Sequence, residues 1–278
     1  MWQCFIYTEK LYFENQQCNS NKLCSFTAIG KSYAMEISFN GKRALVTGAG
    51  KGIGRTIAIE LLKCGAHVIA LSRTQADLDS LKAEQPTMEV LLCDLSHWDE
   101  ARAAISKLGA IDLLVNNAAI AVCTPSLTAK PEDFDAMMNI NVKAAINVSQ
   151  MVAEGLVARG SGGAIVNISS QASMAALENH MIYSASKAAL DSITKVMALE
   201  LGSKNIRVNA VNPTVITTAM SMVGWSDPVK ERWMKERIPL GRFGDPLEVA
   251  YPVLFLLSDK ASMITGVTLP IDGGFTAC

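Results

Sequence analysis

The chain has 278 residues, of which 50% are hydrophobic and 18% charged, so it can form a single α/β domain of about 240 residues with a large core. Its formal net charge of −1 provides no electrostatic basis for binding nucleic acid or an anionic membrane. No apolar run reaches the roughly 18 residues of a membrane-spanning helix. The seven cysteines are scattered and lack metal-site spacing, which predicts no metal site and fits a reducing compartment, the cytoplasm.

Residues 1–34 differ from the rest of the chain, since they are rich in Asn, Gln, Ser, Lys and Cys and show no clear period. A secretory signal would need an apolar segment that is missing here, and a mitochondrial presequence would have more Arg and less Glu. We therefore expect a poorly ordered N-terminal extension at 1–34, followed by one domain at 35–278. A targeting role outside these patterns stays open as the alternative.

From residue 43 onward, short apolar runs alternate with helical segments. The runs lie at 44–46, 68–71, 90–92, 113–115, 164–168, 206–211 and 267–271. Short, almost continuous apolar strands between helices are typical of a parallel sheet that is covered on both faces. The pattern therefore predicts a single doubly wound Rossmann-type α/β domain with a parallel seven-stranded sheet, which binds ligands at the carboxyl ends of its strands.

A glycine-rich turn follows the first of these strands. The sequence Thr-Gly-Ala-Gly-Lys-Gly-Ile-Gly at 47–54 leads into a helix over 55–64. Gly48 allows a tight turn, while Gly52 and Gly54 let the backbone approach a pyrophosphate that the free amides of the helix N-terminus would hold. A glycine turn without a ligand is the alternative, but the strand–turn–helix context and the next strand at 67–72 favour a dinucleotide site.

The end of the second strand predicts which dinucleotide is used. NAD-binding folds usually place a carboxylate there for the ribose 2′-OH, whereas this chain has Ser72, Arg73 and Thr74. The Arg73 guanidinium suits a phosphate, and Lys51 in the glycine turn could reach the same place, so the two cations predict NADPH rather than NADH. Asp77 is expected on the solvated face of the next helix. An ordinary surface arginine is the alternative for Arg73.

The third and fourth strands also end in polar or small residues. Asp94 ends the third strand and could hydrogen-bond an adenine, while Asn-Asn-Ala-Ala at 116–119 would let the backbone approach the adenosine half of the cofactor. Each could equally be a strand-end cap or a turn, so only their position favours binding.

A tyrosine and a lysine four residues apart, Tyr183 and Lys187, lie on one face of a predicted helix. A lysine ammonium one turn away favours the phenolate and lowers the tyrosine pKa from its usual value of about 10. Ser170, at the end of the fifth apolar run, could point its hydroxyl at the same oxygen. The three groups predict proton transfer to or from a carbonyl oxygen, although Tyr-x-x-x-Lys alone is a weak signal.

These motifs, with Asn141 and Asn212-Pro213, occur in one chain in an order that resembles the short-chain dehydrogenase/reductases over about residues 37–278. The resemblance implies that Tyr183 donates a proton, Lys187 holds the nicotinamide ribose, Ser170 polarises the carbonyl and Asn141 positions a water in a proton relay. It implies a cofactor-binding set of Gly48, Lys51, Gly52, Ile53, Gly54, Arg73, Thr74, Asp94, Leu95, Asn117, Ala118, Tyr183, Lys187, Pro213, Val215, Ile216 and Thr218.

Stretches at 72–81, 211–214, 225–228, 237–241 and 269–278 resemble a branch of this family that uses NADPH to reduce L-xylulose to xylitol and small α-dicarbonyls such as diacetyl. Ala119 and Thr214 depart from the broader family, and both residues fit this branch. The implied substrate-binding set is Ser170, Gln171, Leu177, His180, Tyr183 and Trp225, with Trp225 on a segment that could close as a lid. A packed loop histidine is the alternative for His180, and an aromatic at a subunit contact for Trp225.

The resemblance also implies a homotetramer, built from the helices around 133–159 and 184–201 and from the last strand. The alternative is that the apolar face of the second helix simply covers the sheet. Two other functions stay open: an NADPH-dependent reductase of 3-oxoacyl thioesters or other carbonyls, and, from another class, a non-catalytic NADP(H)-binding scaffold or sensor. Measurable hydride transfer would separate an enzyme from a scaffold.

Overall fold

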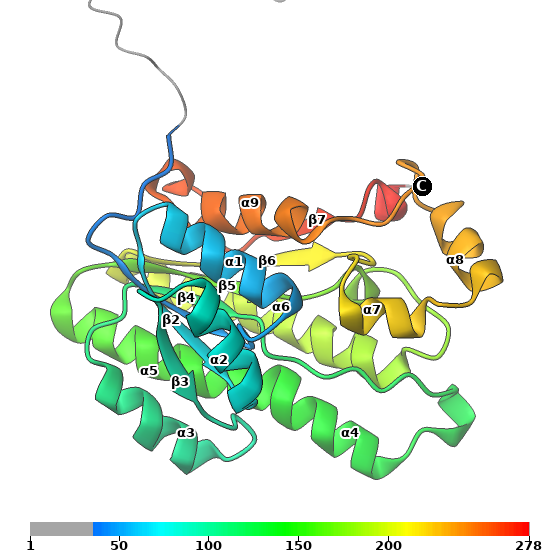
Figure 1. Cartoon of the computed structure of the whole chain (residues 1–278), viewed down its shortest axis with the longest axis horizontal. Helices are drawn as coiled ribbons and strands as arrows, with labels where there is room; N and C mark the ends of the chain where they lie inside the picture. The colour runs from blue at the N-terminus through cyan, green and yellow to red at the C-terminus, as the bar shows by residue number, and fades with distance from the viewer. Residues whose placement is uncertain (1–35, 278) are drawn as a thin grey trace, which may run out of the picture. The chain divides into compact units, whose positions relative to one another are not determined.

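The computed structural model describes residues 36–277, so the expected extension at 1–34 lies outside the described part. A seven-stranded sheet, all of whose pairs are parallel, runs through this part in the order β3-β2-β1-β4-β5-β6-β7 (Figure 1). Its strands are β1 Arg43–Thr47, β2 His67–Ser72, β3 Glu89–Leu92, β4 Leu113–Asn116, β5 Gly163–Ile168, β6 Ile206–Pro213 and β7 Thr268–Ile271. The predicted Rossmann-type fold and its seven strands are confirmed.

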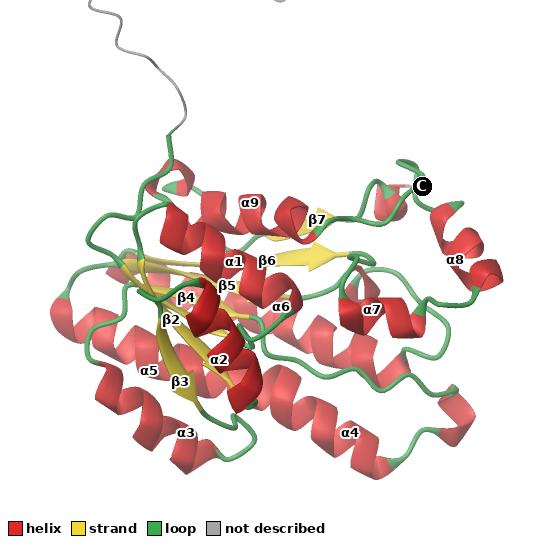
Figure 2. Ribbon diagram, in the orientation of Figure 1, coloured by secondary structure: helices red, strands yellow, loops and turns green. Residues whose placement is uncertain are grey.

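Helices cover both faces of the sheet (Figure 2). They are α1 Gly52–Lys63, α2 Gln75–Glu84, α3 Trp98–Ile105, α4 Pro131–Met138, α5 Ala144–Arg159, α6 Met181–Leu201, α7 Ala219–Gly224, α8 Pro228–Lys235 and α9 Pro246–Leu257. Helices α1, α2 and α9 pack on one face, and α3, α5 and α6 on the other. None of the helices between residues 36 and 277 is both long and apolar enough to cross a membrane.

The side chains of β1 show why the strands read as continuous apolar runs. Ala44 and Val46 pack into the core beneath α1 and α9, while Leu45 points into the opposite core beneath α5, and all three are fully buried. Because successive side chains of a strand point to opposite faces, a sheet covered on both sides needs apolar residues at every position.

The long helix expected around 133–159 is interrupted. A π-helical turn, Asn139–Lys143, separates α4 from α5. Such turns are rare and often occur at functional sites. This one carries Asn141, whose side chain is 1% exposed.

Candidate active site

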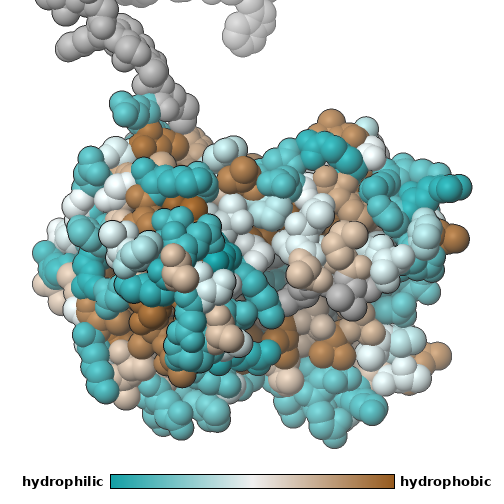
Figure 3. All heavy atoms as spheres, viewed as in Figure 1, coloured by the Kyte–Doolittle hydropathy of each residue, from teal (hydrophilic) through white to brown (hydrophobic). Residues whose placement is uncertain are grey.

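A cleft of about 360 Å³ lies at the carboxyl ends of the strands, where a doubly wound sheet binds its ligand. The face of the molecule in Figure 3 is hollowed near its middle, between the regions that carry α2 and α7. The lining includes the glycine turn after β1, the ends of β2, β3 and β4, the segment after β6, and Tyr183 and Lys187 of α6. Residues as far apart in the chain as Gly48 and Ala219 therefore meet in one cavity.

The glycine turn is held by the end of β4. The Asn117 side chain donates to the carbonyls of Thr47 and Gly48, each at 3.0 Å. The Thr47 hydroxyl accepts from the amides of Asn117 and Ala118, at 3.0 and 3.1 Å. A methyl group on Gly54 would collide with this Asn117 amide and with the Gly48 carbonyl oxygen, 2.5 Å away. The turn is therefore fixed by hydrogen bonds between these two side chains and the backbone, and it leaves no room for a side chain at Gly54.

Two more positions in the turn require glycine because their backbone is left-handed. Gly48 has φ +64° and Gly52 has φ +57°, a region that side-chain-bearing residues rarely adopt. Thr218 lies over Gly52, since its methyl carbon is 3.4 Å from where a Cβ would stand. The Thr218 hydroxyl also accepts from the Ser221 amide at 3.2 Å, which caps α7.

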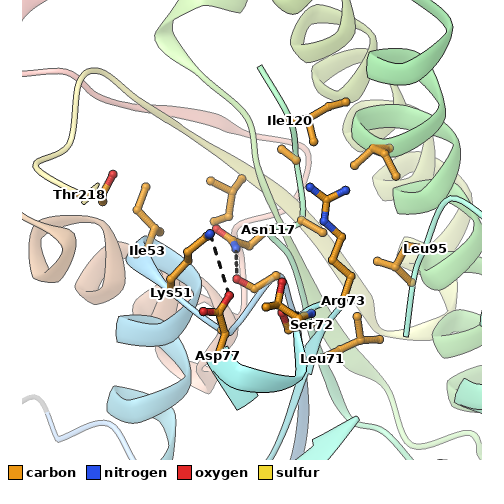
Figure 4. Close-up of a pocket in the computed structure, with 18 of the residues that line it drawn as sticks. Lys51, Ile53, Leu71, Ser72, Arg73, Asp77, Leu95, Asn117, Ile120 and Thr218 are labelled. Carbon is orange, nitrogen blue, oxygen red and sulfur yellow. Dashed lines mark hydrogen bonds and ion pairs between the residues drawn. The ribbon is translucent and has the colours of Figure 1, made fainter. Parts of the chain in front are cut away.

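The two predicted phosphate ligands point to different sides of the cleft. In Figure 4, Lys51 turns to Asp77, whereas Arg73 extends from the end of β2 towards the side of Ile120. The Lys51 Nζ lies 4.0 Å from Asp77 Oδ2. The expectation that Asp77 faces solvent is wrong: its side chain is half-buried in the cleft wall, because Gly50 has no side chain in its way. Gly50 in the glycine turn is the sequence feature that could have predicted the position of Asp77 in the cleft wall.

The end of β3 supplies Asp94 and Leu95 to the lining. Asp94 Oδ1 accepts from the Ser96 amide at 2.9 Å. This hydrogen bond is the main cause that lowers the Asp94 pKa below its usual value, with a smaller contribution from the charge of Arg73. The carboxylate thus stays ionised and fixes the turn after β3.

Tyr183 and Lys187 lie one helical turn apart on α6, with the Lys187 Nζ 5.7 Å from the centre of the Tyr183 ring. The Nζ donates to the Ile168 carbonyl at 2.8 Å, and the lysine is 3% exposed. Burial lowers the Lys187 pKa to about 8, and the charge of Asp191 opposes this shift. Burial likewise raises the pKa of Tyr183, and a hydrogen bond with Ser170 opposes that shift.

Ser170 follows β5 and begins a 3₁₀ turn at Gln171–Ser173. Its hydroxyl accepts from the Ala172 amide at 3.1 Å, so it stands at the cap of that turn. Its carbonyl lies 2.7 Å from the Ser173 hydroxyl oxygen and accepts from the Asn212 side chain at 3.2 Å. The turn directs the Ser170 hydroxyl towards Tyr183, as their hydrogen bond shows.

The side chain of Asn141 is fully used by protein groups. Its Oδ1 accepts from the Ile120 amide at 2.9 Å, and its Nδ2 donates to the Ile120 carbonyl at 2.9 Å and to the Ser186 hydroxyl at 3.0 Å. Ser186 in turn donates to the Tyr183 carbonyl at 2.7 Å. Asn141 therefore ties the π-helical turn to the loop after β4 and to α6.

The four other residues of the predicted substrate set, Gln171, Leu177, His180 and Trp225, do not line this cleft. Gln171 is 1% exposed, and neither atom of its amide has a partner among the described residues. Leu177 and Trp225 pack with Phe243 in a small separate core. The His180 ring meets the Tyr183 ring edge-on, with centres 6.1 Å apart.

His180 has a partner that sequence reasoning missed. Its Nδ1 lies 2.6 Å from the Glu178 carbonyl, which can only accept, so Nδ1 carries the proton. Its Nε2 then accepts from the thiol of Cys123, 3.4 Å away. Cys123 is exposed in the loop after β4. Its position shortly after the Asn-Asn-Ala-Ala motif is the sequence feature that could have placed it near the site.

Three residues of the predicted cofactor set lie behind the lining. Gly54 packs against Asn117 and Gly48, as described above. The Val215 carbonyl accepts from Gly244 at 3.0 Å, and Ile216, which is 4% exposed, pairs with the same residue. The rest of the set reaches the cavity, joined by residues outside the predicted set, among them Gly50, Ser72, Asp77, Ile120, Ile140, Thr214 and Ala219. Within residues 36–277, no cluster of three or more His, Cys, Asp or Glu side chains could hold a metal ion.

The fold and this cleft define a class, the Rossmann-type oxidoreductases that use a nicotinamide cofactor and act on CH–OH groups. A family model described as enoyl-(acyl carrier protein) reductase matches residues 48–276. The chain belongs to the short-chain dehydrogenase/reductase family.

Two curated relatives and one solved structure illustrate the similarity. The chain is 56% identical over 241 residues to an L-xylulose reductase of Mesocricetus auratus, a match that covers 87% of this chain and 99% of that protein. It is 53% identical over 240 residues to a D-erythrulose reductase of Gallus gallus, covering 86% and 98%. A gluconate 5-dehydrogenase of Burkholderia cenocepacia J2315, solved with NADP and tartrate, matches with a TM-score of 0.84 and 33% identity, covering 87% and 98%.

Proposed function

We propose that the chain reduces small polar carbonyls with NADPH, converting L-xylulose to xylitol and reducing α-dicarbonyls such as diacetyl. One observation carries the proposal: in the cleft, the Tyr183 hydroxyl is hydrogen-bonded with Ser170 and lies one turn from the buried Lys187. The names of the relatives, an L-xylulose reductase and a D-erythrulose reductase, support a sugar substrate. The NADP held by the Burkholderia structure supports the choice of cofactor.

The residues of the cleft fit a dinucleotide, because the glycine turn leaves a cradle that side chains would fill at Gly48 and Gly54. Ile53, Asn117, Ala118, Pro213 and Thr218 would flank the cofactor, and Arg73 and Lys51 would hold its 2′-phosphate. When bound, NADPH supplies the hydride that the carbonyl carbon receives.

Tyr183 would give its proton to the carbonyl oxygen while Ser170 donates a hydrogen bond to the same oxygen. Burial alone would make the phenol a poor acid, since it raises the pKa of Tyr183. The Lys187 ammonium, with a pKa of about 8, is mostly charged at neutral pH and favours the phenolate. Because Ile120 and Ser186 occupy the Asn141 amide, a relay water at Asn141 would have to use its main-chain carbonyl.

Gln171 supports a hydroxyl-bearing substrate. It is buried beside Ser170 with an unpaired carbonyl oxygen and an unpaired NH₂ group. Gln171 does not line the cleft as it stands, so a substrate with hydroxyl groups could satisfy both only once its binding opens this amide to the cavity. An apolar acyl chain would leave them unpaired at a cost of about 1–3 kcal/mol each. His180 and Trp225 would complete the wall around such a substrate.

The test is NADPH oxidation by the purified full chain with L-xylulose, diacetyl and an acetoacetyl thioester, with NADH in parallel. We expect turnover of L-xylulose and diacetyl with a strong preference for NADPH. Activity on the thioester alone would keep the mechanism and overturn the substrate assignment. NADPH binding without turnover of any carbonyl would instead favour a scaffold or sensor.

We also propose a homotetramer in the cytoplasm. The expected contact face of α6 is largely uncovered in the single chain, with Val196 49% and Leu199 84% exposed. Met197, by contrast, packs on the sheet, so only part of this helix surface serves the core. Light scattering should give a tetramer for the wild type and smaller species for Leu199→Asp. A monomeric wild type would refute this assembly.

A further inference from the structure

A buried carboxylate with no assigned role lies behind the catalytic groups. Asp191 is on α6, four residues after Lys187 and eight after Tyr183, so the three side chains share one helix face. It is 9% exposed. A buried carboxylate is rare unless it has partners, and its partners here lead to both sides of the catalytic site.

The first connection runs to Ser170. Asp191 Oδ2 accepts from the Ser173 hydroxyl at 2.5 Å and from the Asn212 side chain at 3.0 Å. The same two groups reach the Ser170 carbonyl, at 2.7 and 3.2 Å, and they contact each other at 2.9 Å. The carboxylate therefore anchors the turn that directs the Ser170 hydroxyl.

The second connection runs to Lys187. Asp191 Oδ1 has no hydrogen-bond partner among the described residues, so this oxygen's charge is not neutralised by a direct contact. The field of Asp191 favours the charged form of the buried Lys187 amine. The other titratable groups near this pair are Tyr183, on the same helix, and Cys123, which acts on Tyr183 from the loop after β4. Among residues 36–277, Asp191 is the charged group that acts on Lys187.

We propose that Asp191 is a positioning residue for the reduction, which holds the Ser170 turn through Ser173 and Asn212 and keeps the Lys187 amine protonated through its negative charge. One carboxylate thus sets both the geometry of the hydroxyl that polarises the carbonyl and the charge that activates Tyr183. This inference deepens the proposed function and depends on it for the kinetic readout only.

Two variants separate charge from hydrogen bonding. Asp191→Asn removes the charge and keeps an oxygen that can accept from Ser173 and Asn212. Ser173→Ala keeps the charge and removes one of the hydrogen bonds. Circular dichroism and NADPH binding would first establish that each variant is folded and binds the cofactor.

The first readout is the pH profile of kcat/KM for carbonyl reduction. We expect Asp191→Asn to move the alkaline limb to lower pH by about one unit, because Lys187 loses its proton sooner, and so to lower kcat/KM about twofold at pH 7 and close to tenfold above pH 8. Ser173→Ala should lower kcat/KM and leave the limb in place. An Asp191→Asn limb at the wild-type position would overturn the electrostatic role.

The second readout does not need turnover. Trace acetylation with acetic anhydride across pH, with the Lys187 peptide quantified against the exposed Lys195 on the same helix, follows the ionisation of the amine directly. Asp191→Asn should shift the Lys187 curve to lower pH by about the same one unit. An unchanged curve would refute the inference. If no carbonyl is reduced while the labelling curve shifts, the proposed function fails and the coupling of Asp191 to Lys187 stands.

Discussion

The nucleotide end of the cleft presents mainly backbone, whereas the catalytic end presents side chains. At the first, the Asn117 side chain and the Thr47 hydroxyl hold backbone carbonyls and amides, and the resulting turn admits no side chain at Gly54. At the second, residues from β5, α6 and the loop after β4 converge, and many are buried polar groups. The two ends should therefore respond to different substitutions: a larger side chain disrupts the first, and removal of a side-chain group disrupts the second.

The catalytic end also carries electrostatic strain. Burial lowers the pKa of Lys187 and raises that of Tyr183, so both groups are held in an environment that opposes their charged forms. Perturbed pKa values of this kind cluster at functional sites. We therefore expect substitutions there to affect rate first and stability second, with the reverse order at the glycine turn.

The largest expected effect is the loss of the Tyr183 hydroxyl. Tyr183→Phe removes the acid and leaves the nucleotide end untouched, so turnover should fall by roughly 10²–10⁴ while NADPH affinity changes little. Steady-state kinetics and fluorescence titration would measure the two. Tyr251→Phe, at a tyrosine that is 57% exposed on α9, is the matched control and should keep wild-type turnover. Near-normal turnover of a folded Tyr183→Phe variant would remove Tyr183 from the mechanism.

The next largest effect is the loss of unfolding free energy that burial of Lys187 causes, which depends on pH. Its folded pKa of about 8 lies below the ordinary 10.5, so between these values the unfolded chain binds more protons and the wild type gains stability as pH rises. Relative to Lys187→Met, the wild type should gain up to about 3 kcal/mol in unfolding free energy between pH 8 and 10.5. Urea unfolding of the cofactor-free proteins would measure the gap.

The exposed Lys195 on α6 provides the control, since Lys195→Met should show a gap that stays constant with pH. A constant gap for Lys187→Met as well would mean that the lysine is not destabilised by its surroundings. In that case the electrostatic strain assigned to the catalytic end would be absent.

The same contrast explains which features of the fold and the site could be predicted from the sequence. The seven strands and the glycine turn follow from local patterns, because a covered parallel strand needs apolar residues and a tight turn needs glycine. The proximity of Tyr183 and Lys187 could be predicted because the two residues lie one turn apart on one helix. The π-helical turn at Asn139–Lys143 has no local signature, so the sequence suggested one continuous helix.

Long-range side-chain contacts were beyond local patterns. Asp77 was expected in solvent because the sequence places it on a helix, and only the packing of Gly50 brings it to the cleft. The Cys123–His180 contact joins residues 57 apart, and the Asp191 network joins α6 to β6. Such contacts depend on how the loops pack against the sheet, and no short sequence motif predicts that packing. The roles of the site residues remain predictions.

A smaller effect is expected at the glycine turn. Gly54→Ala adds a methyl group against the Asn117 amide and the Gly48 carbonyl, so it should destabilise the fold by about 1–3 kcal/mol and weaken NADPH binding. Gly202→Ala is the control, since nothing lies within 4 Å of its added carbon, and it should change stability by less than about 0.5 kcal/mol. Equal stability of the two variants in urea unfolding would contradict a turn closed by backbone contacts.

The smallest effect tests whether side chains matter at the nucleotide end at all. Arg73→Ala should raise the Kd for NADPH about tenfold, or ~1.4 kcal/mol, and leave the Kd for NADH nearly unchanged, because only NADPH carries the 2′-phosphate. Asp77→Asn should act in the opposite direction by freeing Lys51 from its partner 4.0 Å away. Arg102→Ala, at an arginine paired with Glu154 away from the cleft, is the control. If Arg73→Ala weakens both dinucleotides equally, Arg73 is a general surface cation, and cofactor choice would rest on backbone geometry alone, extending the backbone character of this end to its specificity.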